Sequence, residues 1–85
     1  MVGQGQDTPI LSPELCRAAR GLLDWTQSNL AEAAEVSRST IRDFEGHRHD
    51  IHRATSAQLR RAFEDNAVVF VAIDDVGPGV CLKIR

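Results

Sequence analysis

The sequence has no long apolar run, and it does not start with a basic segment followed by an apolar one. A membrane-spanning helix needs about 20 consecutive apolar residues, and an export leader needs a basic segment before its apolar core. We therefore expect a cytoplasmic protein that has no membrane partner. Its 85 residues suffice for one small hydrophobic core, with a modest margin of stability.

Cysteine is scarce, and its two positions, Cys16 and Cys81, do not have the paired spacing of a metal site. Cys16 falls in a helical pattern and Cys81 in a strand-like run, so we expect both to be buried, reduced thiols. The three histidines, His47, His49 and His52, lie close together in the sequence. Arginines beside them would repel a cation, so we expect no metal site.

The sequence also lacks the residue patterns of common enzymes. It contains no order of Ser, His and Asp, or of Cys and His, that indicates a nucleophile, and it contains no glycine-rich phosphate loop. The histidine cluster is the one candidate for acid–base chemistry, and it lacks neighbouring apolar and carboxylate residues that would form a pocket. We expect no catalytic residue, no cofactor and no enzymatic activity.

Charge is distributed unevenly along the chain, although the net charge is only −2. Residues 36–61 hold six arginines against three acids, together with all three histidines. Residues 1–35 hold two arginines against five acids, and residues 62–85 hold two cations against four acids. A concentrated basic segment is typical of nucleic-acid binding, and acidic flanks would suppress indiscriminate binding. The alternative is an ordinary solvated charged surface.

The segment 26–41 predicts two short helices joined by a tight turn. Thr26 and Ser37 are the expected N-caps, because their hydroxyls can accept a backbone N–H that lacks a helical partner. Helical spacing predicts that the following apolar residues are buried: Leu30, Ala31, Ala34, Val36, Ile41 and Phe44. The second helix, expected at Ser37–Glu45, would present small polar and cationic side chains outward. Such a helix fits the major groove of DNA, whereas a plain helical bundle needs the same apolar spacing without that surface.

Two longer helices are expected on either side of this pair. The first begins at Ser12-Pro13-Glu14, with serine as the cap and proline in the first turn. Its expected inward residues are Leu15, Ala18, Ala19, Leu22 and Leu23, and Trp25 closes the helix as a core residue. The last helix is expected from Thr55 to about Asp65, ending at a left-handed Asn66. Its expected inward residues are Leu59, Ala62 and Phe63, with Arg60 and Arg61 facing out.

The C-terminal part has a different pattern. Residues 68–73 and 80–84 are strand candidates, and residues 74–79 have turn chemistry. Because a lone hairpin is marginally stable, it must pack on the helices, pair with a second copy or bind another protein. We therefore expect a mostly α, compact four-helix fold with a C-terminal β-hairpin. The expected divisions are a flexible tail at 1–10, a helix-turn-helix domain at 11–66, and a hairpin at 67–85 that is a possible dimerisation element.

The central residues resemble a known family. Their pattern is Gln27-x-x-Leu30-Ala31-x-x-Ala34-x-Val36-Ser37-x-x-Thr40-Ile41-x-x-Phe44-Glu45. This spacing resembles the lambda-repressor-like (XRE-type, Cro/cI) helix-turn-helix DNA-binding family, over roughly residues 12–66. The resemblance implies a sequence-specific transcriptional regulator, expected to be a repressor that binds double-stranded DNA at a palindromic operator as a homodimer. The alternative is an antitoxin that binds operator DNA through its helices and a protein toxin through its hairpin.

The resemblance also implies roles for individual residues. Base contacts are expected from four residues, namely Arg38, Ser39, Arg42 and Asp43. Phosphate contacts are expected from six residues, namely Gln27, Ser37, Thr40, His47, Arg48 and Arg53, the last two in the loop after the recognition helix. Arg20 and Glu45 match a structural ion pair between the first and third helices.

The chain departs from the family at three positions. Glu35 occupies a turn position where the family usually has a left-handed glycine, and a side chain there costs on the order of 1 kcal/mol. Gly46 comes immediately after Glu45, so that His47 fills the slot where the family often has glycine. Ile51 replaces a common loop proline. We expect these departures to alter the loop and its phosphate contacts more than the fold.

Overall fold

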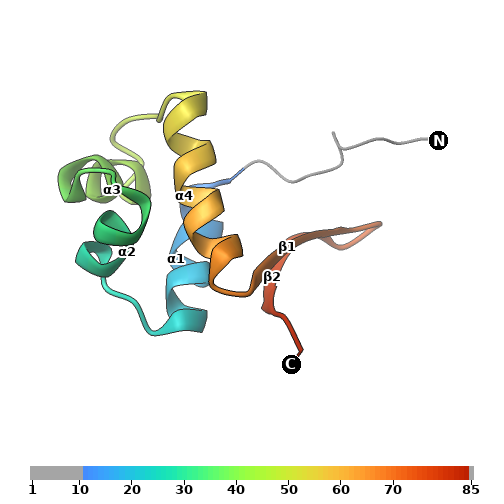
Figure 1. The fold of residues 1–85 in the computed structure, drawn as a ribbon. Coiled ribbons are helices and arrows are strands. Elements are labelled where there is room, and N and C mark those ends of the chain that lie inside the picture. The colour runs from blue at the N-terminus through green and yellow to red at the C-terminus, as the bar shows by residue number, and fades with distance from the viewer. Residues whose placement is uncertain (1–10, 85) are drawn as a thin grey trace.

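The computed structural model describes residues 11–84, so the expected flexible tail at 1–10 lies outside the described residues. The elements in chain order are α1 Pro13–Leu23, α2 Gln27–Ala34, α3 Arg38–Glu45, α4 Arg53–Asp65, β1 Val68–Ile73 and β2 Gly77–Leu82. The domain is compact and mostly helical, with four helices followed by one antiparallel two-stranded hairpin, as the sequence predicts (Figure 1). Within residues 11–84, no helix combines the length and the apolar character needed to cross a membrane.

Hydroxyl side chains begin the first three helices. The hydroxyl oxygen of Ser12 accepts the Leu15 N–H at 3.1 Å, and that of Ser37 accepts the Thr40 N–H at 3.2 Å. Thr26 and Asn29 cap each other reciprocally, with hydrogen bonds of 2.9 and 3.0 Å. Helices α2 and α3 have only eight residues each. Helices this short are marginal on their own, so the caps and the packing of their apolar faces keep them formed.

Several residues other than glycine have left-handed backbone dihedral angles at the ends of helices. Glu35 ends α2 with φ 58°, in the turn where the sequence departs from glycine. After α3, His47 is left-handed with φ 61°, whereas its neighbour Gly46 has φ −88°. After α3, the left-handed residue is therefore His47, at the position where the family that the sequence resembles often has glycine. Both Glu35 and His47 hold a backbone conformation that a residue with a side chain disfavours.

All four helices and the root of the hairpin share one core. The buried apolar residues are Leu11, Leu15, Cys16, Ala19, Leu30, Ala34, Ile41, Phe44, Leu59, Ala62, Phe63, Val68 and Phe70. Phe63 of α4 stacks on Trp25 with ring centroids 6.0 Å apart and meets Phe70 of β1 edge-on at 6.1 Å. Because Val68 and Phe70 belong to this core, the hairpin is attached to the helices rather than being a separate unit.

Three predictions about helices α1 and α4 are wrong. In α1, Ala18 is exposed and Leu22 is 38% exposed, because the buried stripe is centred on Cys16 and Ala19 instead. Helix α4 begins two residues earlier than expected, at Arg53, with His52 as its N-cap.

The end of α4 also differs from the prediction. Asn66 has φ −110°, and the left-handed residue is Ala67, with φ 73°. The Asn66 side chain instead donates to the carbonyl of Ala62 at 2.8 Å. The amide thus caps the helix from its final turn, and the reversal of chain direction into β1 occurs one residue later.

Arg60 does not point freely outward as predicted. Its guanidinium lies over the Phe70 ring, 4.6 Å from the ring centroid, and it also donates to the Glu64 carboxylate at 3.1 Å. A guanidinium is attracted to the face of an aromatic ring, so Arg60 joins α4 to the hairpin.

The hairpin differs from its prediction in the bounds of its second strand and of its turn. Strand β2 covers residues 77–82 rather than 80–84, and the turn shortens to residues 74–76. Pro78 lies within β2, opposite Ala72, which an edge strand permits. Cys81 was predicted to be buried and is exposed. Its partner in the register is Val69, and alternate residues of a strand point to opposite faces, so Cys81 lies on the face opposite that of the buried Phe70.

Candidate nucleic-acid interface

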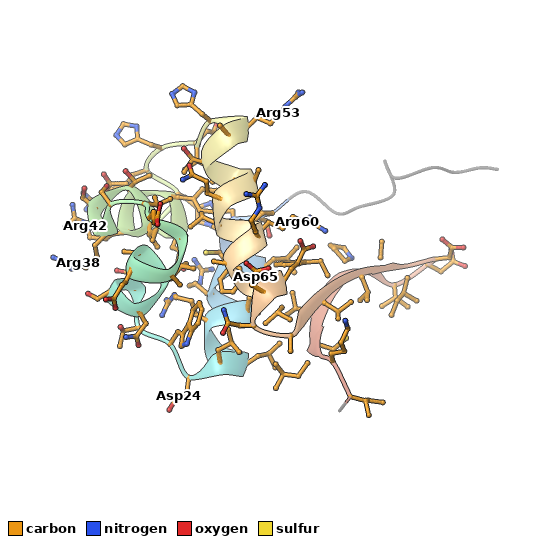
Figure 2. All side chains as sticks on the ribbon, viewed as in Figure 1. Asp24, Arg38, Arg42, Arg53, Arg60 and Asp65 are labelled. Carbon is orange, nitrogen blue, oxygen red and sulfur yellow. The ribbon has the colours of Figure 1, made fainter. Side chains whose placement is uncertain are left out.

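Helix α3 has two faces of opposite character. Ile41, Phe44 and Glu45 are buried against the rest of the domain. Arg38, Ser39 and Arg42 are exposed, together with much of Thr40. Figure 2 shows Arg38 and Arg42 on the side of the molecule turned away from α4. The exposed face is therefore free to meet a partner without any rearrangement of the core.

Asp43 links this helix to the loop that follows. Its carbonyl oxygen accepts the N–H groups of Arg48 at 2.8 Å and His49 at 3.4 Å. Its carboxylate lies 3.4 Å from Nε of Arg42, whose side chain is 54% exposed. Exposed ion pairs between neighbours contribute little free energy, so Arg42 can exchange this partner for another anion.

The N-terminal end of α3 carries a group of three hydroxyls. The oxygens of Ser37 and Thr40 are 2.7 Å apart, and those of Ser37 and Ser39 are 3.3 Å apart. Ser37 also accepts the Thr40 N–H as the helix cap. Ser37 thus combines a structural role with a place among the polar groups beside Arg38.

The residues after α3 form an exposed polar loop. His47, Arg48, His49 and Asp50 are all exposed. Nε2 of His47 lies 3.0 Å from a carboxylate oxygen of Glu14 in α1. A backbone hydrogen bond to Glu14 and the nearby His47 hold the pKa of the Glu14 carboxyl below its usual value. In this structure His47, an expected phosphate contact, therefore has an internal carboxylate partner.

Arg53 does not lie in the loop, as the sequence suggested, but is the first residue of α4. Its side chain is exposed, and Figure 2 places it at the end of α4, apart from Arg38 and Arg42. The structure thus gathers Arg38, Ser39 and Arg42 on one helix face and leaves Arg53 at a distance from them.

A buried ion pair holds α3 against α1. The Arg20 guanidinium donates two hydrogen bonds to the Glu45 carboxylate, of 2.7 and 2.8 Å, and a third to the carbonyl of Trp25 at 2.9 Å. Arg17 donates to the backbone carbonyl of Glu45. Glu45 is only 3% exposed, and a buried carboxylate needs several donors to offset its desolvation. Two arginines of α1 thus fix the C-terminal end of α3.

Gln27 takes part in the same network. Its Nε2 donates to the Glu45 carboxylate at 3.0 Å, from the first turn of α2. We expected Gln27 to contact phosphate, and here its amide joins α2 to α3. Because an amide nitrogen has two N–H donors, this bond occupies only one of them.

The pKa values of the network follow from these contacts. Burial raises the pKa of Glu45, but hydrogen bonds from Arg20, Gln27 and Cys16 outweigh burial, so its pKa lies below the usual value. Burial, reinforced by the adjacent Glu45 carboxylate, raises the pKa of the Cys16 thiol well above its ordinary value. Cys16 therefore stays protonated beside a charged carboxylate.

Sequence reasoning missed the parts that Arg17 and Cys16 take in this network. The available signal was the spacing of Cys16, Arg17 and Arg20, which brings them onto neighbouring positions of one helix. Among residues 11–84, no group of three or more His, Cys, Asp and Glu side chains is arranged to hold a metal ion.

Comparison with protein-family models found no match to this chain, and comparison with curated proteins found none that is similar to it.

Proposed function

We propose that this chain is a sequence-specific DNA-binding regulator of the lambda-repressor-like helix-turn-helix type, with α3 as its recognition helix. The observation that carries the proposal is the division of α3 into a buried face and an exposed face. The buried face contains Ile41 and Phe44, and the exposed face presents Arg38, Ser39 and Arg42. A helix held by one side and polar on the other has the form required to enter the major groove.

In this proposal, base edges are read by Arg38, Ser39, Arg42 and Asp43. An arginine that donates two hydrogen bonds to a guanine discriminates against other bases by about 1–3 kcal/mol. Asp43 anchors the loop through its backbone and keeps its carboxylate beside Arg42. It can accept a hydrogen bond from a cytosine amino group, the contact that carboxylates make in the major groove.

Phosphate contacts come from residues around this helix. Ser37 and Thr40 lie at its N-terminal end, and Arg48 lies in the exposed loop after it. Gln27 can donate its second N–H to a phosphate while its first holds Glu45. Such contacts set the position of the protein on the duplex and are sensitive to salt.

The regulatory output that fits a small domain of this kind is repression, in which the bound protein occupies an operator. Proteins that read DNA with one short helix commonly bind as dimers to two half-sites about one helical turn apart. We propose a homodimer on a palindromic operator, in the cytoplasm, without a cofactor.

Selection of bound fragments from random duplex DNA tests the proposal most directly. We expect enrichment of a short motif, with two inverted copies if the dimer binds as proposed. The matched control is the double variant Arg38→Ala and Arg42→Ala, which changes only exposed side chains of α3. Enrichment of the same motif by this variant, or no enrichment by the unmodified chain, would contradict the proposed role of α3.

A further inference from the structure

The hairpin is apolar on both of its faces. Between residues 67 and 82, the charged side chains are only Asp74 and Asp75, both in the turn. A sheet that packs on one face and meets water on the other alternates apolar and polar residues, whereas a continuous apolar run is typical of strands buried on both faces. The composition of this hairpin therefore fits a second covering surface.

The helices bury one face of the hairpin only at its root, and Leu82 on that same face is 46% exposed. Val68 and Phe70 are buried against the helices, with Val80 packed beside them. Figure 1 shows the rest of the hairpin extending beyond the helices, on the side of the molecule opposite α3. Ile73 is 55% exposed, and Val76 in the turn is 78% exposed. We call the opposite face, formed by Val69, Val71, Ile73 and Cys81, the open face. On it Val69 and Val71 are half-buried, and Ile73 and Cys81 are exposed.

We propose that the open face is the contact surface for a second copy of this chain, with the two hairpins antiparallel about a two-fold axis. The charges at the two ends of the hairpin select this partner and this direction. Asp74 and Asp75 lie at the tip, and Lys83 follows β2 at the root. An antiparallel arrangement places the acidic tip of one copy beside the lysine of the other, and the symmetry forms the contact twice. A parallel arrangement would place like charges together, which is unfavourable.

The charges of the hairpin have no competing ion-pair partner in the part of the chain that the structure describes. Among residues 11–84, neither the two tip aspartates nor Lys83 forms an ion pair. All three charges therefore stay available for a partner that approaches the hairpin.

Pro78 favours contact through the face over contact through the strand edge. The Lys83 N–H donates to Ala67 at 2.7 Å, toward β1. Because N–H directions alternate along a strand, the backbone nitrogens of residues 78, 80 and 82 point to the open edge of β2. Pro78 has no N–H to donate there, and proline on an edge hinders the addition of another strand. Addition of a strand at the edge of β2 is therefore hindered, and we place the contact between the two copies on their open faces.

The dimer deepens the proposed function and rests on it for its DNA contact. Since the hairpin projects on the side opposite α3 (Figure 1), its pairing leaves both recognition helices exposed. Four side chains per copy form a smaller interface than the roughly 800 Å² per partner of a stable complex. We therefore expect a dissociation constant in the micromolar range.

Sedimentation equilibrium of the full chain without DNA tests the dimer, over loading concentrations from below one to a few hundred micromolar. We expect a reversible monomer–dimer equilibrium. Ile73→Lys should raise the dissociation constant at least tenfold, while Ala33→Lys, at an exposed position of α2, should leave it unchanged. A monomer at every concentration would overturn the proposal and leave the open face to a different protein. A dimer that Ile73→Lys does not weaken would also overturn it.

A charge exchange tests the antiparallel direction. Lys83→Asp should weaken the dimer, and adding Asp74→Lys and Asp75→Lys to it should restore the dimer. No recovery in the triple variant would overturn the antiparallel arrangement. Binding of Ile73→Lys to a single half-site separates this outcome from a failure of the proposed function, because half-site binding requires α3 and does not require the hairpin.

Discussion

Arg20 and Glu45 lie 25 residues apart in the sequence and meet through two hydrogen bonds, of 2.7 and 2.8 Å, between α1 and α3. Glu45 is the last residue of α3, so this contact fixes the end of the helix opposite the one that carries Arg38. A stiff attachment at one end keeps the exposed face at a defined angle to the rest of the domain. The ion pair is thus a positioning device for the proposed recognition helix.

Replacing Glu45 should destabilise the domain more than replacing an exposed acid. Glu45→Gln keeps the size of the side chain but leaves the Arg20 guanidinium without a charged acceptor. We expect a loss of about 2 kcal/mol in the free energy of unfolding, the scale of a hydrogen bond to a charged group. Glu64→Gln, which breaks an exposed pair with Arg60 on α4, should cost about 0.5 kcal/mol or less. Urea unfolding followed by the fluorescence of Trp25 measures both, and equal losses would contradict the assigned role.

The Glu45 carboxylate should make the stability of the domain depend on pH. The pKa of Glu45 in the folded state lies below the ordinary value of 4.5, so the unfolded chain takes up a proton first as the pH falls. The contribution of Glu45 to stability is therefore complete above about pH 4.5 and is lost as the pH falls through the folded-state pKa. Unfolding free energies measured between pH 6 and pH 3 should fall more steeply for the unmodified chain than for Glu45→Gln. Parallel curves would show that Glu45 does not carry this dependence.

The turn between α2 and α3 should gain stability from glycine. Glu35 has φ 58° and ψ 43°, a conformation that glycine adopts without steric cost. We expect Glu35→Gly to raise the free energy of unfolding by about 0.5–1 kcal/mol, the balance of relieved strain against greater freedom of the unfolded chain. Glu35→Ala removes the same charge but keeps the Cβ atom, so it should show no such gain. Thermal unfolding of the two variants side by side distinguishes conformation from charge.

Two arginines near α3 should affect DNA binding in different ways. Arg38→Ala should lose about 1–3 kcal/mol on the selected motif and little on random duplex, because a base contact carries the sequence information. Arg48→Ala should weaken both duplexes alike and should reduce the slope of log affinity against log salt by about 1. Fluorescence anisotropy titrations at several salt concentrations provide both values. Equal losses on the two duplexes for Arg38→Ala would count against base reading by this residue.

The two thiols should differ sharply in reactivity. Cys81 is exposed, whereas Cys16 is buried and its pKa is raised by burial and by the Glu45 carboxylate. A disulfide reagent applied to the folded monomer should therefore modify one thiol quickly and the other only on unfolding. Cys81→Ser should remove the fast reaction, and a fast reaction that persists in this variant would contradict the burial of Cys16. At concentrations where the proposed dimer forms, the fast reaction of the unmodified chain should slow.

Local signals in the sequence determined where the first three helices begin. Ser12, Thr26 and Ser37 mark the helix starts, because a hydroxyl at an N-cap satisfies a nearby backbone N–H without help from the rest of the fold. The spacing of Leu30, Ile41 and other apolar residues likewise indicated which faces are buried. The left-handed turn at Glu35 was indicated by the resemblance to the family, in which this position usually holds a left-handed glycine.

Only part of the candidate site could be predicted from the sequence. Helical spacing alone places Arg38 and Arg42 on a common outer face of α3, since the buried Ile41 and Phe44 occupy the inner one. The contacts of Gln27 with Glu45 and of His47 with Glu14 could not be predicted, because each acid lies on a different element from its partner. Spacing along a chain does not encode the distance between two helices.

Tertiary structure alone decided the remaining features. The position of Arg60 over Phe70 and the exposure of Cys81 depend on how the hairpin pairs and where its root meets α4. A shift of one residue in strand register reverses the face on which every side chain lies, and this hairpin, apolar on both faces, carries no alternation to fix that choice in advance. The sequence thus determined the features that depend on interactions between residues close together in the chain, such as the helix caps. Tertiary structure decided the features that depend on how distant segments pack against one another.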